Sequence, residues 1–201
     1  MPINFIAGSY ISNEVCNGVI SFFEENCKYH MPGTTGCGVI PEWKDSTDLR
    51  VHPKTTDIRI KIYLNALTEV CQEYIKLFPW SSKDHGSWRI NEAFNIQKYL
   101  PTQGFHKWHT ERNCSDGCNP FRHMVFMTYL NTITDGGETE WFHQNIKLKP
   151  KKGLTIIWPA DWTHVHRGIP SPTQTKYIVT GWYSYDTSTY NYEVLNKTSV
   201  R

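Results

Sequence analysis

Two short stretches of the chain, GFHKWHTERN and DWTHVHRGIP, place a histidine two residues from another polar side chain. In an extended strand, residues i and i+2 project from the same face. His109 and Glu111 can therefore offer an imidazole nitrogen and a carboxylate oxygen to one metal ion. In the second stretch His164 and His166 also share a face, so this rule does not choose between them. Either histidine would complete a set of two imidazoles and one carboxylate.

This set of ligands suits more than one chemistry. It leaves open positions on an octahedral Fe(II) ion, which is the arrangement that non-haem Fe(II) oxygenases use. Zn²⁺ with the same ligands would leave one position for water, which favours hydrolysis. Histidines in an aromatic-rich β protein can also be packing residues. In that case the chain would be a non-enzymatic binding or structural protein.

The segment KYIVTGWYSY adds a candidate anion-binding group. Its alternation places Lys176, Ile178, Thr180, Trp182 and Ser184 on one face of a strand. A buried lysine is costly unless it meets an anion, and a dicarboxylate cosubstrate would remove this cost. The alternative is a lysine that faces solvent at the start of the strand.

Two helices are expected ahead of these segments. Apolar residues recur at three- and four-residue intervals over residues 13–29, after a candidate cap at Asn13. A second helix is expected from about residue 57 to 78, because Pro79 stops the run. Between them, PGTTGCGVIPEWKDSTD is rich in turn-forming residues and is predicted to be a long loop.

From about residue 88 the pattern changes to short β-type segments separated by turn signals. These segments are FNIQKYL, RHMVFMTYLN, ETEWFHQ, GLTIIWP and KYIVTGWYSY. The sequence therefore predicts an α+β, mainly β protein, with a sandwich or jelly roll behind supporting helices. We expect a single domain over residues 1–201, because no linker separates the two parts. Residues 1–85 would be the helical support region, 86–186 the core and 187–201 a C-terminal tail.

Composition limits the partners and the setting. Eight Trp and eleven Tyr supply large surfaces to bury, so the chain should fold. The formal net charge of +2, with both signs interspersed, gives no strong nucleic-acid or membrane signal. The opening residues lack the pattern of a signal peptide and the six Cys form no regular framework, so a cytoplasmic setting is expected. Cys114 and Cys118 raise the question of a zinc or redox site, but CSDGC has no second Cys pair and is interpreted as a loop.

With these residues in view, the C-terminal half resembles the Fe(II)/2-oxoglutarate dioxygenase superfamily, and is most similar to its prolyl 4-hydroxylase-like branch. That branch has His-x-Asp/Glu, a distal His, and Arg or Lys roughly ten residues on. His109, Glu111, His166 and Lys176 match this pattern, and Pro170 follows His166 at the usual distance. The resemblance covers about residues 92–185. It implies a double-stranded β-helix (jelly roll) core and assigns the iron to His109, Glu111 and His166, with His164 in reserve.

The resemblance also implies a cosubstrate pocket. Its residues would be Lys176, Tyr99, Tyr129, Thr180 and Trp182. One departure is that the family usually has Asp where this chain has Glu111, whose carboxylate is one methylene further from the backbone. Asp116 and Asp135 are alternative acids, but neither lies two residues from a histidine.

The implied activity is hydroxylation of a C–H bond with Fe(II), 2-oxoglutarate and O2, releasing succinate and CO2. L-ascorbate commonly keeps the iron of this branch reduced. Peptidyl proline is the leading substrate by resemblance, so a protein or peptide partner is expected. Another protein side chain, a free amino acid or a nucleobase are the alternatives. Candidates for the entrance to the active site are Arg167, the segment GFHKW and the predicted loop PGTTGCGVIPEWKDSTD.

Overall fold

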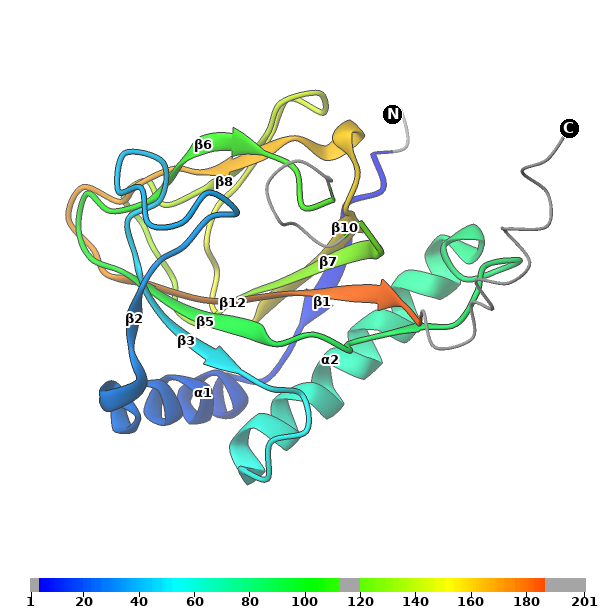
Figure 1. Ribbon diagram of the computed structural model, residues 1–201, viewed down its shortest axis with the longest axis horizontal. Coiled ribbons are helices and arrows are strands. Elements are labelled where there is room, and N and C mark those ends of the chain that lie inside the picture. Colours follow the sequence, from blue (N-terminus) through cyan, green and yellow to red (C-terminus); the bar gives the residue numbers. More distant parts are fainter. Residues whose placement is uncertain (1–3, 113–119, 187–201) are drawn as a thin grey trace, which may run out of the picture.

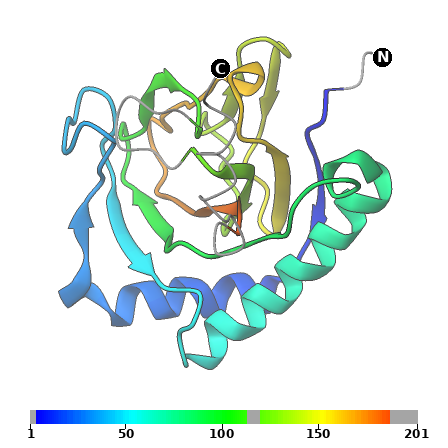
Figure 2. The same cartoon turned by 45° about the vertical axis from the view of Figure 1, so that its right-hand side comes forward.

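The computed structural model describes residues 4–112 and 120–186, and in this part the chain forms two facing antiparallel sheets with two α-helices outside the larger one (Figures 1 and 2). The larger sheet has the order β1 (Ala7–Tyr10), β10 (Leu154–Pro159), β7 (Arg122–Tyr129), β12 (Lys176–Tyr185), β5 (Phe94–Tyr99), β3 (Thr47–Val51) and β2 (Met31–Pro32), with β4 (Trp88–Arg89) also paired to β12. The smaller sheet has the order β6 (Phe105–His109), β11 (His166–Gly168), β8 (Thr139–Trp141) and β9 (Ile146–Leu148). This arrangement confirms the predicted jelly roll with supporting helices.

The two predicted helices are present, with small shifts at their ends. Helix α1 spans Asn13–Glu25, and its cap is Ser12, whose side chain accepts a hydrogen bond from the backbone N–H of Val15. The expected cap at Asn13 is wrong by one residue, because Ser12 is the last residue with extended backbone angles. A separate 3₁₀ turn, Cys27–Tyr29, follows where the sequence predicted continuous helix.

Helix α2 spans Ile58–Leu77, close to the predicted limits. Asp57 caps it by accepting a hydrogen bond from the backbone N–H of Arg59, and Pro79 begins a 3₁₀ turn that ends the helical path. The predicted Leu67, Val70, Cys71 and Tyr74 are buried against the sheet, together with Ile60 and Tyr63. Ile58 and Ile62, which the apolar pattern also placed on this face, are exposed. No helix in the described residues is both long and apolar enough to cross a membrane.

Strand β12 connects the helical layer to the space between the sheets. Its bounds are those of the predicted segment KYIVTGWYSY. Val179 and Tyr183 belong to the core under the helices, whereas Ile178 and Trp182 belong to the core between the sheets. The period of two therefore turns Lys176, Thr180 and Trp182 away from the helices, as the sequence predicted.

The first 85 residues also supply strands β1, β2 and β3 to the larger sheet, which the sequence did not predict. Strand β3 lies at the end of the predicted loop and pairs with β5 from Thr47↔Lys98 to Val51↔Phe94. Its segment TDLRV is short and follows turn-forming residues, so its sequence alone does not indicate a strand. Pairing with β5 stabilises the extended conformation. Strands β6, β9 and β11 were missed for the same reason. The division of the chain into one domain stays a prediction.

One position in β12 tests how tightly this layer is packed. A Cβ atom added at Gly181 would lie 2.4 Å from Cζ of Phe126 and 2.6 Å from Cβ of Phe94. We expect Gly181→Ala to lower the free energy of unfolding by about 1–3 kcal/mol, because buried rings must shift to admit the methyl group. Chemical denaturation measures this change. Gly86→Ala is the control, since an added Cβ there meets nothing within 4 Å; equal midpoints for the two variants would contradict the expectation.

Candidate metal centre

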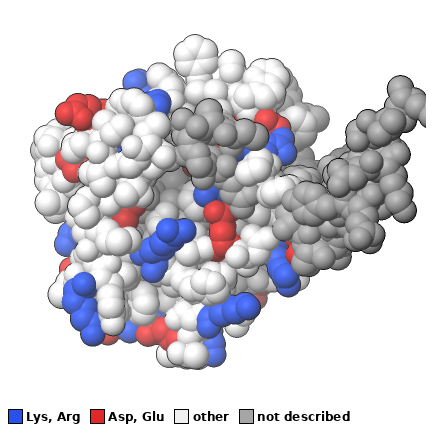
Figure 3. Space-filling model, in the orientation of Figure 1, with Lys and Arg blue, Asp and Glu red and all other residues white. Residues whose placement is uncertain are grey.

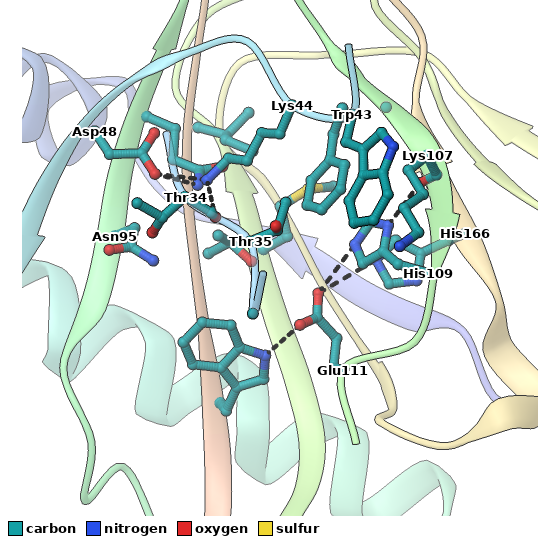
Figure 4. A pocket seen from close by; sticks show the side chains of 18 of the residues that line it. Thr34, Thr35, Trp43, Lys44, Asp48, Asn95, Lys107, His109, Glu111 and His166 are labelled. Carbon is teal, nitrogen blue, oxygen red and sulfur yellow. Dashed lines mark hydrogen bonds and ion pairs between the residues drawn. The ribbon is translucent and has the colours of Figure 1, made fainter. Parts of the chain in front are cut away.

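A cavity of about 300 Å³ lies between the two sheets. Its walls come from β5, β7, β12, β6 and β11, and from the chain between β2 and β3 (Figure 4). The cavity contains both groups that the sequence singled out, the histidine–glutamate cluster and the polar face of β12. The predicted entrance loop lines it through residues such as Thr35 and Lys44, and GFHKW lines it through Phe105 and Lys107.

The three proposed ligands meet on one side of this cavity. His109 is the last residue of β6 and His166 the first of β11, and the two are register partners with ring centroids 4.3 Å apart. Glu111 Oε1 lies 3.5 Å from His109 Nε2 and 3.4 Å from His166 Nε2. Two neighbouring ligands that each lie about 2.1 Å from one ion are about 3 Å apart. The donor set therefore fits a single ion with little movement.

A hydrogen bond from Nδ1 to a backbone carbonyl fixes the orientation of each imidazole ring. His109 Nδ1 donates to the backbone carbonyl of Lys107 at 3.0 Å, and His166 Nδ1 donates to that of His164 at 2.9 Å. A carbonyl oxygen only accepts, so Nδ1 carries the proton and each Nε2 presents a lone pair to the shared space. Burial and the neighbouring His166 lower the pKa of His109, which keeps it in the neutral form that binds a metal.

His164, the reserve ligand, lies elsewhere. It ends the 3₁₀ turn Trp162–His164, so the alternation rule for strands does not apply to it. Its Nε2 donates to the backbone carbonyl of Asn4 at 2.9 Å, and its Nδ1 lies 2.9 Å from Thr163 Oγ1. Both ring nitrogens are engaged, and among the described residues the cluster that could hold an ion comprises His109, Glu111 and His166. The geometry thus favours His166.

The second carboxylate oxygen of Glu111 is held by two groups. Trp182 Nε1 donates to Oε2 at 2.9 Å, and Arg122 Nη1 lies 3.6 Å from the same atom. Arg122 also stacks on the Trp182 ring at 3.4 Å and pairs with Glu92 at 2.8 Å. Burial works to raise the pKa of Glu111, but in the metal-free site protons that His109 and His166 carry on Nε2 hold it well below its usual value, and a metal ion would take the place of these protons. Glu111 is therefore an anion with Oε1 directed at the histidines.

Trp182 has a contact that the sequence did not predict. It lines the cavity, as expected of an aromatic wall, and its indole N–H also bonds to Glu111. Arg122 was missed altogether, because nothing in RHMVFMTYLN distinguishes its first residue from an ordinary charged strand end. Together the two side chains restrain the longer glutamate that replaces the usual aspartate.

We expect Trp182→Phe to weaken binding of Mn²⁺ or Fe(II) by about tenfold, the lower end of what loss of an outer hydrogen bond costs a metal site. The ring remains but Oε2 loses its donor, so the carboxylate can turn away from the imidazoles. Titration of Mn²⁺ followed by electron paramagnetic resonance measures the affinity. Trp80→Phe is the control, since that indole is 66% exposed. Equal affinities for both variants would show that the Trp182 hydrogen bond does not position Glu111.

Lys176 is buried, so the solvent-facing alternative is wrong. Its residue is 3% exposed, and Nζ donates to the backbone carbonyls of Gly137 at 3.0 Å and Ile169 at 3.4 Å. No carboxylate of the described residues lies within ion-pair distance of it. Burial lowers the pKa of Lys176 to about 8, which the charge of Glu138 partly opposes. A buried cation without a counter-ion fits an anionic ligand in the same cavity.

The remaining predicted pocket residues divide into two groups. Thr180 and Tyr99 line the cavity, and Lys176 Nζ lies 5.0 Å above the Tyr99 ring. Tyr129 is fully buried and donates to Thr139 Oγ1 at 2.7 Å, while Thr139 lines the cavity. Tyr129 itself does not line the cavity, but its hydroxyl contacts Thr139, which does.

Other candidates from the sequence lie apart from the cluster. Asp135 is exposed and accepts a hydrogen bond from Thr173. Arg167 pairs with Glu140 at 2.8 Å and does not line the cavity. The remaining ones, Asp116, Cys114 and Cys118, lie outside the described residues.

A buried ion pair on the cavity wall was not foreseen. Lys44 Nζ lies 2.6 Å from Asp48 Oδ2, both side chains are almost fully buried, and Gln97 Nε2 donates to the same oxygen at 3.1 Å. Gln97 Oε1 in turn accepts from the Tyr99 hydroxyl at 2.9 Å. This chain of contacts ties the segment between β2 and β3 to the cavity. No sequence signal identifies it, because Lys44 and Asp48 lie in a turn-rich stretch.

Comparison with known proteins shows what the C-terminal half of the chain is similar to. Residues 94–184 match the family model of the 2OG-Fe(II) oxygenase superfamily, a range that includes both histidines, Glu111 and Lys176. The chain is similar to this superfamily over that range, which is just under half of its length. Members of the superfamily are 2OG-Fe(II) oxygenases. No curated protein sequence matches the chain.

Solved structures of prolyl hydroxylases share the fold. A viral collagen prolyl hydroxylase from Paramecium Bursaria Chlorella virus-1, in complex with 2OG, superposes with a TM-score of 0.67 at 19% identity, covering 90% of this chain and 97% of that one. A Pseudomonas putida prolyl-4-hydroxylase gives 0.67 at 13% identity, covering 90% and 92%. A Trichoplax adhaerens prolyl hydroxylase, in complex with a hypoxia inducible factor peptide fragment, gives 0.67 at 14%, covering 98% and 86%.

Proposed function

We propose that this protein hydroxylates a C–H bond of a peptidyl proline, using O2 and 2-oxoglutarate and releasing succinate and CO2. The observation that carries the proposal is the convergence of two Nε2 lone pairs and one carboxylate oxygen in the same cavity as a buried lysine that has no carboxylate partner among the described residues. An octahedral Fe(II) ion accepts this donor set and keeps positions for other ligands.

Each group has a separate task in this proposal. His109, Glu111 and His166 would hold Fe(II), which with 2-oxoglutarate supplies the activation of O2. Lys176 would bind the far carboxylate of 2-oxoglutarate, with Thr180 beside it on the same strand face. Trp182 and Arg122 keep Glu111 oriented, and the two sheets exclude bulk water. L-ascorbate as a reductant and a cytoplasmic setting belong to the same proposal.

A peptide substrate is supported by the surroundings of the cavity. The segment between β2 and β3 forms one wall of its mouth, and Figure 3 shows that the face is hollowed there. One structurally similar prolyl hydroxylase is described in complex with a peptide fragment. An open mouth between a loop and a sheet admits a chain segment more readily than a closed small-molecule site does.

The test is succinate formation from 2-oxoglutarate over a panel of proline-containing peptides under Fe(II) and ascorbate. We expect one class of peptide to stimulate succinate formation and to gain the mass of one oxygen atom. The His166→Ala variant serves as the inactive control. Activity that persists with Zn²⁺ alone, or hydroxylation of a free amino acid or nucleobase in place of the peptides, would contradict the proposal.

A further inference from the structure

A second groove adjoins the cavity on the outer edge of the larger sheet. The end of α1, the 3₁₀ turn after it, β2, β3 and the chain that follows β3 form its walls. Met31 and Arg50 line both this groove and the cavity. The two spaces therefore share a wall, and a chain that leaves the cavity over Met31 and Arg50 enters the groove.

The groove is lined by basic side chains. Lys28, His30, Arg50, His52 and Lys54 contribute to it, and no Asp or Glu of the described residues does. Among the described residues, Lys28, Arg50 and Lys54 make no ion pair, and all three are exposed. In Figure 3, Lys and Arg side chains are among those that cover α1, β2 and β3.

The acidic residues near these cations in the sequence are already engaged elsewhere: Asp48 pairs with Lys44 and Asp57 with Arg59. Glu24 pairs with Lys98 at 2.9 Å, and Glu25 pairs with Arg59 at 2.7 Å. Neither glutamate lines the groove. Within residues 4–112 and 120–186, the positive charge of the groove is therefore not neutralised, although the net charge of the whole protein is only +2. Such a local excess attracts an anionic partner and favours its rapid association.

We propose that the substrate is a peptide that carries acidic residues beside the hydroxylated residue, and that this basic groove binds them. The inference rests on the proposed function, because the groove continues from the cavity in which hydroxylation would occur. A peptide accounts for both spaces with one ligand: the target side chain enters the cavity, and the flanking carboxylates meet Lys28, Arg50 and Lys54.

The test uses three labelled peptides of equal length with one central proline. One has three Glu on the N-terminal side, one has three Glu on the C-terminal side, and one has Gln at all these positions. Fluorescence anisotropy with Mn²⁺ and 2-oxoglutarate measures binding without turnover. We expect one of the Glu peptides to bind about tenfold more tightly than the Gln peptide, as three exposed ion pairs provide. High salt should reduce this difference.

Variants locate the effect. Lys28→Glu/Lys54→Glu should abolish the preference for the Glu peptide, while 2-oxoglutarate affinity stays unchanged because neither lysine lines the cavity. Lys61→Glu/Lys151→Glu is the matched control, since it makes the same change in net charge at exposed positions outside the groove. This control should retain the preference.

The outcomes separate this inference from the proposed function. Equal binding of Glu and Gln peptides overturns the groove assignment, even where both peptides are hydroxylated. Lysine-dependent binding of a Glu peptide without hydroxylation under Fe(II) supports the groove and contradicts the proposed reaction. A single-stranded oligonucleotide that binds through Lys28 and Lys54 more tightly than either Glu peptide overturns the choice of a peptide.

Discussion

His166→Ala is expected to abolish binding of Fe(II) and Mn²⁺, whereas His164→Ala should leave most of it. His166 Nε2 faces Glu111 Oε1 at 3.4 Å, while both nitrogens of His164 are engaged with Asn4 and Thr163. Loss of a ligand should cost more than the roughly 10–100-fold that loss of an outer-sphere partner costs. We therefore expect at least about a 100-fold loss for His166→Ala. Anaerobic titration with Fe(II), or calorimetry with Mn²⁺, measures it.

Both histidines are buried, so the comparison needs a check on folding. His164 and His166 are 3% and 6% exposed, and either replacement leaves a cavity. Thermal melts without metal report that cost separately from metal affinity. If His164→Ala removes the metal from a folded protein and His166→Ala does not, the choice of ligand is wrong.

Period-two alternation predicted more of the site than any other pattern did. It placed His109 and Glu111 together, although β6 ends at His109 and Glu111 follows in a bend, and it placed Lys176, Thr180 and Trp182 on one face of β12. The rule depends only on the local geometry of an extended chain, so it holds wherever the chain is extended. It failed to separate His164 from His166 because His164 lies in a 3₁₀ turn, and the resemblance to the family made that choice.

The features that were missed depend on contacts between distant segments. Arg122 meets Glu111 only because β7 lies beside β12, which carries Trp182. The Lys44–Asp48 pair and strand β3 depend on β5, which follows them by more than forty residues in the sequence. A short strand in a turn-rich stretch contains too few alternating apolar and polar residues for the pattern to be detected. Its stability comes from pairing, which one sequence does not show.

Lys176→Ala should lower the affinity for 2-oxoglutarate by about two to four decades, as expected when a buried charge pair loses one partner. The alanine removes a cation that is 3% exposed and whose hydrogen bonds in the described residues go only to carbonyl oxygens. Affinity for Mn²⁺ alone should be unchanged, because Lys176 is not in the ligand cluster. Calorimetry with Mn²⁺ in place of Fe(II) measures both quantities.

The pH dependence of the parent protein gives a second measure of the same contact. Burial lowers the pKa of Lys176 to about 8, so the lysine is a cation below that pH and neutral above it. An anionic cosubstrate needs the cation, and its affinity should therefore fall as the pH rises through 8, towards tenfold per pH unit. Lys176→Arg should retain part of the binding and lose this fall, because a guanidinium stays charged. If Lys176→Ala binds 2-oxoglutarate as tightly as the parent, the lysine does not hold its carboxylate, and the buried cation serves the fold alone.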